Sequence, residues 1–315
     1  MAEFHYSDVA EISFDSMPEL AGFTNDPIAM YVGCPGKRGH LTLGFELDKS
    51  GKSILRDLDR RAPLIVQQAL YFDKELPGLP CVYILSSGGP NVDGDRYSQD
   101  ILLKKDAMAF IGTGAATKLA EMKRNYSGMR QTITLEAGAY LEYRPEPIIP
   151  CRHTRYISDT SIVIDPTATL FYSEIYMPGR KYYKEGEIFE YDVLSVCSHA
   201  KRPDGEELFR EKLIIQPRGG HVRDTGTMGD FDVFANVIVL APHEIANGIY
   251  EQTNPFFDAS SRLAAGITRL PNQAGLLYKA LGMEPGPVKK MVRDFCSVVR
   301  QHVKGRPLPA EFPWR

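Results

Sequence analysis

One loop of the chain carries residue types that could bind a phosphate group or a metal ion. Residues 86–100, SSGGPNVDGDRYSQD, combine several glycines with Asn91, Asp93 and Asp95, and they follow an apolar run. A Walker phosphate loop requires a Lys-Ser/Thr pair that enters a helix, and this loop leads into a further predicted strand instead. A calcium loop requires alternating oxygen ligands and a closing Glu, and only these three side chains qualify. The pattern therefore favours a strand connection in which glycines adopt positive φ and Asp side chains cap the turn.

Two Cys-x-His pairs form a second chemical signal, Cys151/His153 and Cys197/His199. On a strand, residues i and i+2 face one side, so each pair could hold a soft metal and both together could form a tetrahedral site. The alternative is two half-buried thiols beside surface imidazoles, and it is favoured because buried Cys is common. The chain has no H-x-x-x-H pair and no G-x-S-x-G frame, which argues against a zinc hydrolase and a serine hydrolase.

Three carboxylates stand in strand-like segments. Glu142 and Glu174 interrupt apolar and aromatic runs, where an unpaired charge would cost several kcal/mol. Glu211 lies in a more polar run, where exposure is easier to accommodate. Ion pairing is the structural alternative for each of them, and the candidate partners are Arg144, Arg155, Arg180 and Lys212. Taken singly, each carboxylate is predicted to be structural.

The elements that must position these groups are mainly strands. From about residue 41 to 240, short alternating apolar runs are separated by Gly, Pro, Asn and Asp. The predicted strands are LTLGFEL, LIVQQALYF, CVYILS, SIVID, ATLFYSEIYM, IFEYDVLSV, ELFREKLIIQ and FDVFANVIVL. A weak strand-turn-strand repeat returns at Ala107, Ala139 and Ala168 and favours stacked coils. The alternative is a run of β-hairpins in a sandwich.

Helices are few. Residues 288–303 follow a 3.6-residue apolar period that Gly305 and Pro307 terminate, and a shorter helix is predicted over 244–252. Residues 1–40 are predicted to form a loosely structured, flexible N-terminal arm. Residues 41–315 are predicted to form a single domain, with the strand ladder to about 240 and a mixed α/β part over 241–315.

Composition excludes several classes of protein. The 315 residues suffice for one large or two small domains. Lys and Arg total 37 against 40 Asp and Glu, a formal charge of −3, which argues against a nucleic-acid binder or a membrane-surface protein. The first residues contain no basic region followed by an apolar segment, so no signal peptide is predicted. Five scattered cysteines are typical of reduced thiols, so the sequence predicts a cytoplasmic protein.

A set of short motifs, taken in order, resembles the urease accessory protein D family (UreD, also called UreH). The matching stretches are APLIVQ (62–67), SGG (87–89), GDR (94–96), GAATK (114–118), LEYRPEPIIP (141–150), YSE (172–174), GR (179–180), AGITRLP (265–271) and ALG (280–282). They run from about residue 40 to the C-terminus, and their number and order make the match specific.

The resemblance implies a cytosolic, non-enzymatic protein with a β-helix-like fold and a small C-terminal helical element. It implies a scaffold that docks on apo-urease and recruits accessory protein F, through which the nickel-carrying GTPase, accessory protein G, is engaged. Ni²⁺ would then cross an internal water-filled passage to urease, without any stably bound cofactor. Nucleic acid and membrane are not expected partners.

The family's metal-passage positions match Asp95, Thr117, Glu174 and Glu211, and Asp95 is expected to face the wet passage. Further motif positions, whose roles the resemblance leaves less defined, are Lys118, Glu142, Arg180 and Glu187. Several thiolates or imidazoles would hold Ni²⁺ too tightly for transfer, whereas carboxylates, hydroxyls and water are weak, replaceable ligands.

Two alternatives remain open at this point. One is a β-solenoid interaction module unrelated to urease, because fold does not fix function. The other is a carboxylate-based enzyme that uses Asp93 and Asp95 with Glu142 or Glu174 as acid or base. No nucleophile, cofactor fingerprint or metal triad accompanies those carboxylates.

Overall fold

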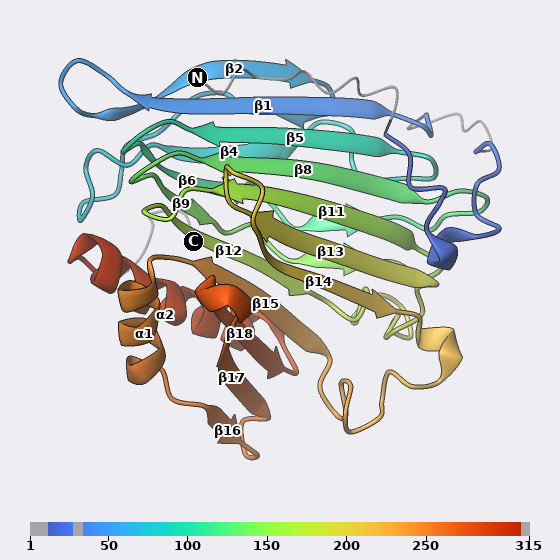
Figure 1. The fold of residues 1–315 in the computed structure, drawn as a ribbon. Helices are drawn as coiled ribbons and strands as arrows, with labels where there is room; N and C mark the ends of the chain where they lie inside the picture. Colours follow the sequence, from blue (N-terminus) through green and yellow to red (C-terminus); the bar gives the residue numbers. More distant parts are fainter. Residues whose placement is uncertain (1–11, 28–33, 310–315) are drawn as a thin grey trace.

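The computed structural model describes residues 12–27 and 34–309, and over these residues it shows two β-sheets and two α-helices (Figure 1). The first sheet has the spatial order β14-β13-β11-β8-β5-β1-β2. Its strands are β1 (Arg38–Leu47), β2 (Ser53–Arg61), β5 (Arg96–Leu103), β8 (Ser127–Leu135), β11 (Arg155–Ile164), β13 (Val193–Lys201) and β14 (Glu207–Ile215). The five inner strands run parallel, and β2 and β14 pair antiparallel at the edges.

The second sheet has the order β16-β17-β18-β15-β12-β9-β6-β4-β3, with β10 and β7 attached beside β12. Its strands are β3 (Leu64–Ile65), β4 (Cys81–Ser86), β6 (Met108–Thr113), β7 (Thr117–Leu119), β9 (Tyr140–Tyr143), β10 (Ile148–Pro150), β12 (Thr169–Tyr176), β15 (Val233–Leu240), β16 (Phe256–Asp258), β17 (Leu263–Arg269) and β18 (Gly275–Gly282). The prediction of a mainly β fold is confirmed.

The sequence repeat corresponds to three strand-turn-strand units, β5–β6, β8–β9 and β11–β12. In the first sheet Ile101 lies opposite Ile133, and Ile133 lies opposite Ile162, in one parallel register. In the second sheet β6, β9 and β12 are also parallel. The alanine at each turn is buried (Ala107, Ala139 and Ala168). Equivalent strands of successive units therefore pair in parallel, and the two strands of one unit lie in different sheets and do not form a hairpin.

The largest apolar core lies between the two sheets, because alternate residues of each strand point inward. A second core covers the outer face of the second sheet, where Phe171 of β12 packs against Phe295 with ring centroids 6.0 Å apart. The helices α1 (His243–Gln252) and α2 (Pro285–Lys304) supply this cover at the β15–β18 end of the sheet (Figure 1). Both helices were predicted, and α2 ends at Gly305 with φ 67° as expected. Among the described residues, no helix combines the length and apolar character needed to cross a bilayer.

Two predicted strands are wrong over much of their length. Of residues 64–72, only Leu64–Ile65 form a strand. Of residues 188–196, the strand begins only at Val193, because Phe189 adopts φ 56°, a left-handed conformation that a strand cannot contain. The edge strand β2 was missed because its sequence, SILRDLDRR, is largely polar.

The described part of the N-terminal arm packs on the outer face of the first sheet. Ile12, Phe14 and Leu20 are buried against Tyr126 and Ile157. A single turn of 3-10 helix, η2 (Pro18–Leu20), contacts β13. The first strand begins at residue 38, inside the range assigned to the arm.

Candidate functional site

The loop over residues 86–100 is held by Asp95, whose side chain has no exposed surface. Its Oδ1 accepts the backbone N–H of Lys37 at 2.8 Å, and its Oδ2 accepts the backbone N–H of Val92 at 2.9 Å and the hydroxyl of Tyr97 at 2.8 Å. The Lys37 ammonium lies 2.8 Å from Oδ2. The carboxylate is thus satisfied by the protein, and it fixes the loop against the start of β1.

Asp93 plays a similar part on the other side of the loop. Its carboxylate accepts the backbone N–H groups of Lys123, Arg124 and Asn125 at 3.3, 3.0 and 2.7 Å. Gly94, between the two acids, has φ 78° and stands against Pro27, where a Cβ would approach to 2.6 Å. The interpretation of the loop as a capped chain reversal is confirmed, because N–H donors occupy the oxygens that a cation would need.

Between the two sheets lies a set of polar side chains that we call the buried polar layer. Each member points inward from its strand, and all but one have an exposed fraction below 10%. The members are Gln99, Gln131, Tyr143, Thr160, Tyr172, Glu174, Ser198, Glu211 and Asn236.

In the first sheet the layer follows a single register line. Gln99 lies opposite Gln131, Gln131 opposite Thr160, Thr160 opposite Ser198, and Ser198 opposite Glu211. Neighbouring strands about 4.8 Å apart therefore carry one polar position each, from β5 to the antiparallel edge strand β14.

Hydrogen bonds connect this line to the second sheet. They join Tyr143 OH to Gln99 Oε1 (3.3 Å), Thr160 Oγ1 to Tyr172 OH (3.2 Å) and Asn236 Nδ2 to Glu211 Oε2 (2.9 Å). The rings of Tyr143 and Tyr172 stack at 5.1 Å. The layer is thus one connected polar tract within an otherwise apolar core.

Glu174 is the acidic centre of the layer. It is 6% exposed, and Tyr172 OH donates to its Oε1 at 3.0 Å, while Oε2 has no hydrogen-bond partner in the described part of the chain. Burial raises the pKa of Glu174 to about 7, and the charge of Glu211 adds to the rise. A carboxyl group poised near neutrality inside a core is a candidate functional group.

Further unsatisfied polar atoms surround Glu174. Asn236 lies directly opposite Glu174 in the sheet register, and Tyr176 follows two residues later on the same face of β12. Asn236 Oδ1 and Ser198 Oγ are buried without a hydrogen-bond partner among residues 12–27 and 34–309, and Tyr176 OH faces the Glu174 carboxylate. Buried polar groups are normally paired, so this end of the layer has the capacity to bind water or a cation.

The layer reaches the surface at two ends. Glu211 has a side chain 24% exposed, and Lys279 of β18 pairs with its Oε1 at 2.7 Å. At the other end, a cleft of about 400 Å³ between residues 86–91 and 113–118 is lined by Thr117 and Lys118, and it reaches Gln99. The structure therefore places three of the four predicted passage residues on or beside the layer. Asp95, which was expected to face the passage, is instead enclosed by donors from its own loop and from Lys37 and does not line the cleft.

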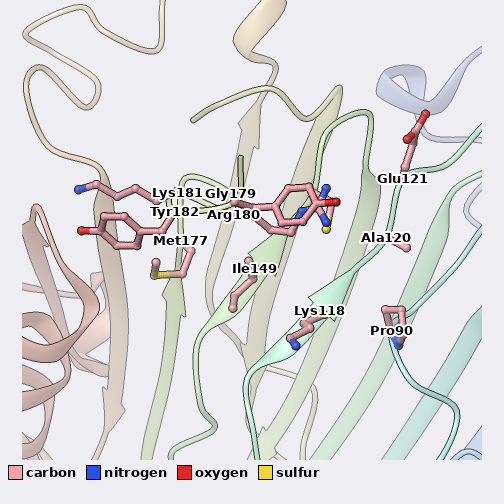
Figure 2. A pocket seen from close by; sticks show the side chains of 12 residues that line it. Pro90, Lys118, Ala120, Glu121, Ile149, Met177, Gly179, Arg180, Lys181 and Tyr182 are labelled. Carbon is pink, nitrogen blue, oxygen red and sulfur yellow. The ribbon is translucent and has the colours of Figure 1, made fainter. Parts of the chain in front are cut away.

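The other motif residues divide into two groups. Lys118 and Arg180 line a second cleft of about 720 Å³ together with Tyr182, as Figure 2 shows. Glu187 is buried beside that cleft, where its Oε2 accepts Arg180 Nε at 2.7 Å and the backbone N–H of Arg152 at 3.2 Å. These three motif residues form one local group.

Glu142 lies elsewhere, on the outer face of the second sheet beneath α2. Arg300 Nε lies 2.6 Å from its Oε1 and Nη2 lies 2.9 Å from its Oε2. Burial opposes ionisation here, but the charges of Arg300 and Arg144 hold the pKa of Glu142 below its usual value. A permanently ionised, paired carboxylate is suited to structure and unsuited to general acid catalysis.

The alternative in which both Cys-x-His pairs form one tetrahedral metal site is wrong. Cys151 and His153 lie outside the strands, with Cys151 in the second cleft and His153 Nδ1 3.3 Å from Asp192. Cys197 and His199 do lie on one face of β13. The neighbouring residues, however, belong to the middle of β11, and Cys151 and His153 precede that strand. Their neighbour there is Asp159, which the sequence did not reveal because only the strand register brings it near.

Sequence reasoning also missed most of the buried polar layer. Gln99, Gln131 and Thr160 each stand among apolar residues at inward positions of a strand. That alternation was a usable signal for each residue, but their alignment into one line depends on long-range register.

Comparisons with known proteins give a consistent result. The family model described as "UreD urease accessory protein" matches residues 37–315. The chain is 48% identical over 296 residues to "Urease accessory protein UreD 2" of Brucella suis biovar 1, which covers 94% of this chain and 98% of that protein. It is 42% identical over 304 residues to "Urease accessory protein UreD" of Yersinia enterocolitica, covering 95% of this chain and 93% of that protein.

Proposed function

The chain belongs to the UreD family of urease accessory proteins, and on this premise we propose that it serves urease maturation by passing Ni²⁺ to apo-urease. Members of this family are accessory proteins and not enzymes. In the proposal the protein works in the cytosol, docks on the urease subunits, and recruits accessory protein F and, through it, the GTPase G. The family resemblance supports these partners, and the parallel stacking of the three repeat units supports a β-helix-like description of the fold.

The observation that carries the proposal is the buried polar layer. Its donors are carboxylate, hydroxyl, phenol and amide oxygens, and the described members include no thiol or imidazole. Such ligands bind a borderline ion such as Ni²⁺ weakly, so the ion can leave each position for the next. A tract of this kind suits transfer better than storage.

Each site residue has a stated part in the proposal. Thr117 lies at the opening of the cleft that reaches the layer, and Asp95 holds the loop that forms the wall of that opening. Glu174 supplies the central carboxylate. With a pKa of about 7 it is partly protonated at neutral pH, so an arriving cation displaces the proton. Glu211 supplies the exit, where the cation competes with Lys279.

The decisive experiment is the nickel content of urease matured with the Glu174→Gln variant. Gln keeps the shape of the side chain but removes the displaceable proton and the charge. We expect urease and the other accessory proteins to stay bound in pull-downs, while nickel per urease active site falls. Glu244→Gln, an exposed change on α1, is the matched control. Unchanged nickel loading in Glu174→Gln would refute the passage.

The wider maturation role has its own test. Deletion of the gene is expected to leave urease assembled but nickel-poor, and full urease activity on limiting nickel would refute it. A failed pull-down against apo-urease would favour an interaction module unrelated to urease. A carboxylate-based enzyme is disfavoured, because Asp93 and Asp95 brace the loop and Glu142 is locked to Arg300.

A further inference from the structure

We propose that Asp159, Cys197 and His199 form a binding site for one divalent transition-metal ion of the borderline class represented by Zn²⁺ and Ni²⁺. The site lies on the outer face of the first sheet. It is separate from the buried polar layer and does not depend on the passage of nickel.

Strand register builds this site. Asp159 of β11 lies directly opposite Cys197 of β13, and His199 follows Cys197 on the same face. Ser198, between them, points to the interior and belongs to the buried polar layer. One strand therefore presents two metal ligands outward and one hydroxyl inward.

The ligand atoms are close enough for a single ion. The thiol sulfur, a ring nitrogen and a carboxylate oxygen all lie within 4.8 Å of one another. Ligands at about 2.0–2.3 Å around a tetrahedral ion stand roughly 3.3–3.7 Å apart, so small side-chain rotations bring the three onto one centre. One sulfur, one nitrogen and one oxygen ligand leave a fourth position for water.

The surroundings supply a second, independent indication. His199 Nδ1 is buried and has no hydrogen-bond partner among the described residues, although the Asp159 carboxylate lies 3.6 Å away. Cys197 is buried at 6% exposure, while the side chains of His199 and Asp159 are 23% and 26% exposed. A metal ion bound to this cluster would give the unpaired His199 nitrogen a partner, and solvent can reach the cluster to deliver the ion.

Protonation is compatible with metal binding. Burial lowers the pKa of His199, which keeps its ring neutral and able to ligate. Burial and the nearby Asp159 raise the pKa of the Cys197 thiol, so the ion must displace a proton, which passes to solvent. Affinity is therefore expected to increase with pH.

Three cationic side chains face the same surface, and each is engaged. Lys212, opposite Cys197, pairs with Glu19 at 2.7 Å, and Arg210, opposite His199, lies 3.6 Å from Glu207. On the other side, Arg130 lies opposite Asp159 and 5.3 Å from the centre of the Phe14 ring. Their charges oppose a cation in part, which lowers the affinity expected of the site.

The test is a titration of the full-length, tag-free protein with Co²⁺ as a spectroscopic probe, followed by displacement with Zn²⁺ and Ni²⁺. We expect one equivalent to produce a thiolate-to-cobalt charge-transfer band that Zn²⁺ removes. Loss of even an outer-sphere partner weakens metal affinity about 10–100-fold, so Cys197→Ser, His199→Ala and Asp159→Asn are each expected to cost at least about 100-fold.

The second Cys-x-His pair is the matched control, and Cys151→Ser with His153→Ala is expected to leave the band and the affinity unchanged. Glu174→Gln is also expected to leave them unchanged, which separates this site from the proposed passage. Persistence of the band in Cys197→Ser, or its loss in the control pair, would overturn the site. If a Cys197 variant fails to fold, alkylation of the wild type decides: Zn²⁺ must protect Cys197, and equal labelling with and without Zn²⁺ refutes the proposal.

Discussion

Arg300 of α2 and Glu142 of β9 form a two-pronged ion pair in which neither side chain has any exposed surface. The third guanidinium nitrogen, Nη1, lies 2.5 Å from Asp73, which is also fully buried. Asp73 in turn accepts the backbone N–H groups of Glu75 and Leu76 at 3.0 Å. One arginine therefore fixes α2 to the second sheet and to the irregular segment before β4.

Arg300→Met is expected to destabilise the protein by about 3–5 kcal/mol, because it removes the guanidinium that pairs with two buried carboxylates and leaves only Arg144, 3.6 Å from Glu142, as a nearby charge. Denaturant unfolding measures the change, with Arg306→Met, at an exposed position, as the control. A loss below 1 kcal/mol, on the order of an exposed pair, would show that the buried pair does not anchor the helix. The triple variant Arg300→Met, Glu142→Leu, Asp73→Asn is expected to recover part of the loss.

Glu174→Gln is expected to change the pH dependence of stability. The folded protein keeps the Glu174 proton up to about pH 7, whereas an unfolded chain releases it near pH 4.5. The stability contributed by the neutral acid is thus complete below about pH 4.5 and is lost as the pH rises through 7. The variant stays neutral, so it is expected to gain about 3 kcal/mol over the wild type across this window. Unfolding curves that stay parallel at every pH would contradict this.

Asp95→Ala is expected to cost about 3 kcal/mol, because the backbone N–H groups of Lys37 and Val92 lose a buried acceptor at about 1–3 kcal/mol each. The loop over residues 86–100 should also exchange its amide hydrogens faster, which mass spectrometry can follow by peptide. Asp59→Ala on the exposed face of β2 is the control. Exchange in the loop that matches the control would show that Asp95 is not its brace.

Leu20→Ala is expected to cost about 2–5 kcal/mol, because this side chain of the N-terminal arm has no exposed surface. Thermal or denaturant unfolding measures the loss, and Leu47→Ala, at a position 37% exposed, is the control. A cost equal to that of the control would mean that the arm adds little to the stability of the sheet beneath it.

Much of the fold could be predicted from local pattern. Alternation of apolar residues predicted β1, β4, β12 and β15, and the 3.6-residue period with a terminal glycine predicted α2. The failures have local causes. Phe189 has a left-handed backbone in an apolar run, and β2 lies at an edge where polar residues are tolerated.

The candidate site was harder to predict from the sequence, because strand pairing brings together residues that lie far apart in the chain. Glu174 was noted as an acid among aromatics, but its alignment with Asn236 depends on how β12 pairs with β15. Asp159 carried no signal of its own, and it became a candidate ligand only through its register with Cys197. Arg144, one of the predicted partners, does lie 3.6 Å from Glu142, but the two-pronged partner Arg300 lies 158 residues later and was not predicted.

That separation has a consequence for biosynthesis. The ribosome makes Glu142 and Asp73 long before Arg300, which follows them by 158 and 227 residues. Until α2 emerges, both acids lack the guanidinium that pairs with them, so we expect this flank of the second sheet to stay hydrated. A chain truncated before α2 is therefore expected to keep an open, protease-accessible flank.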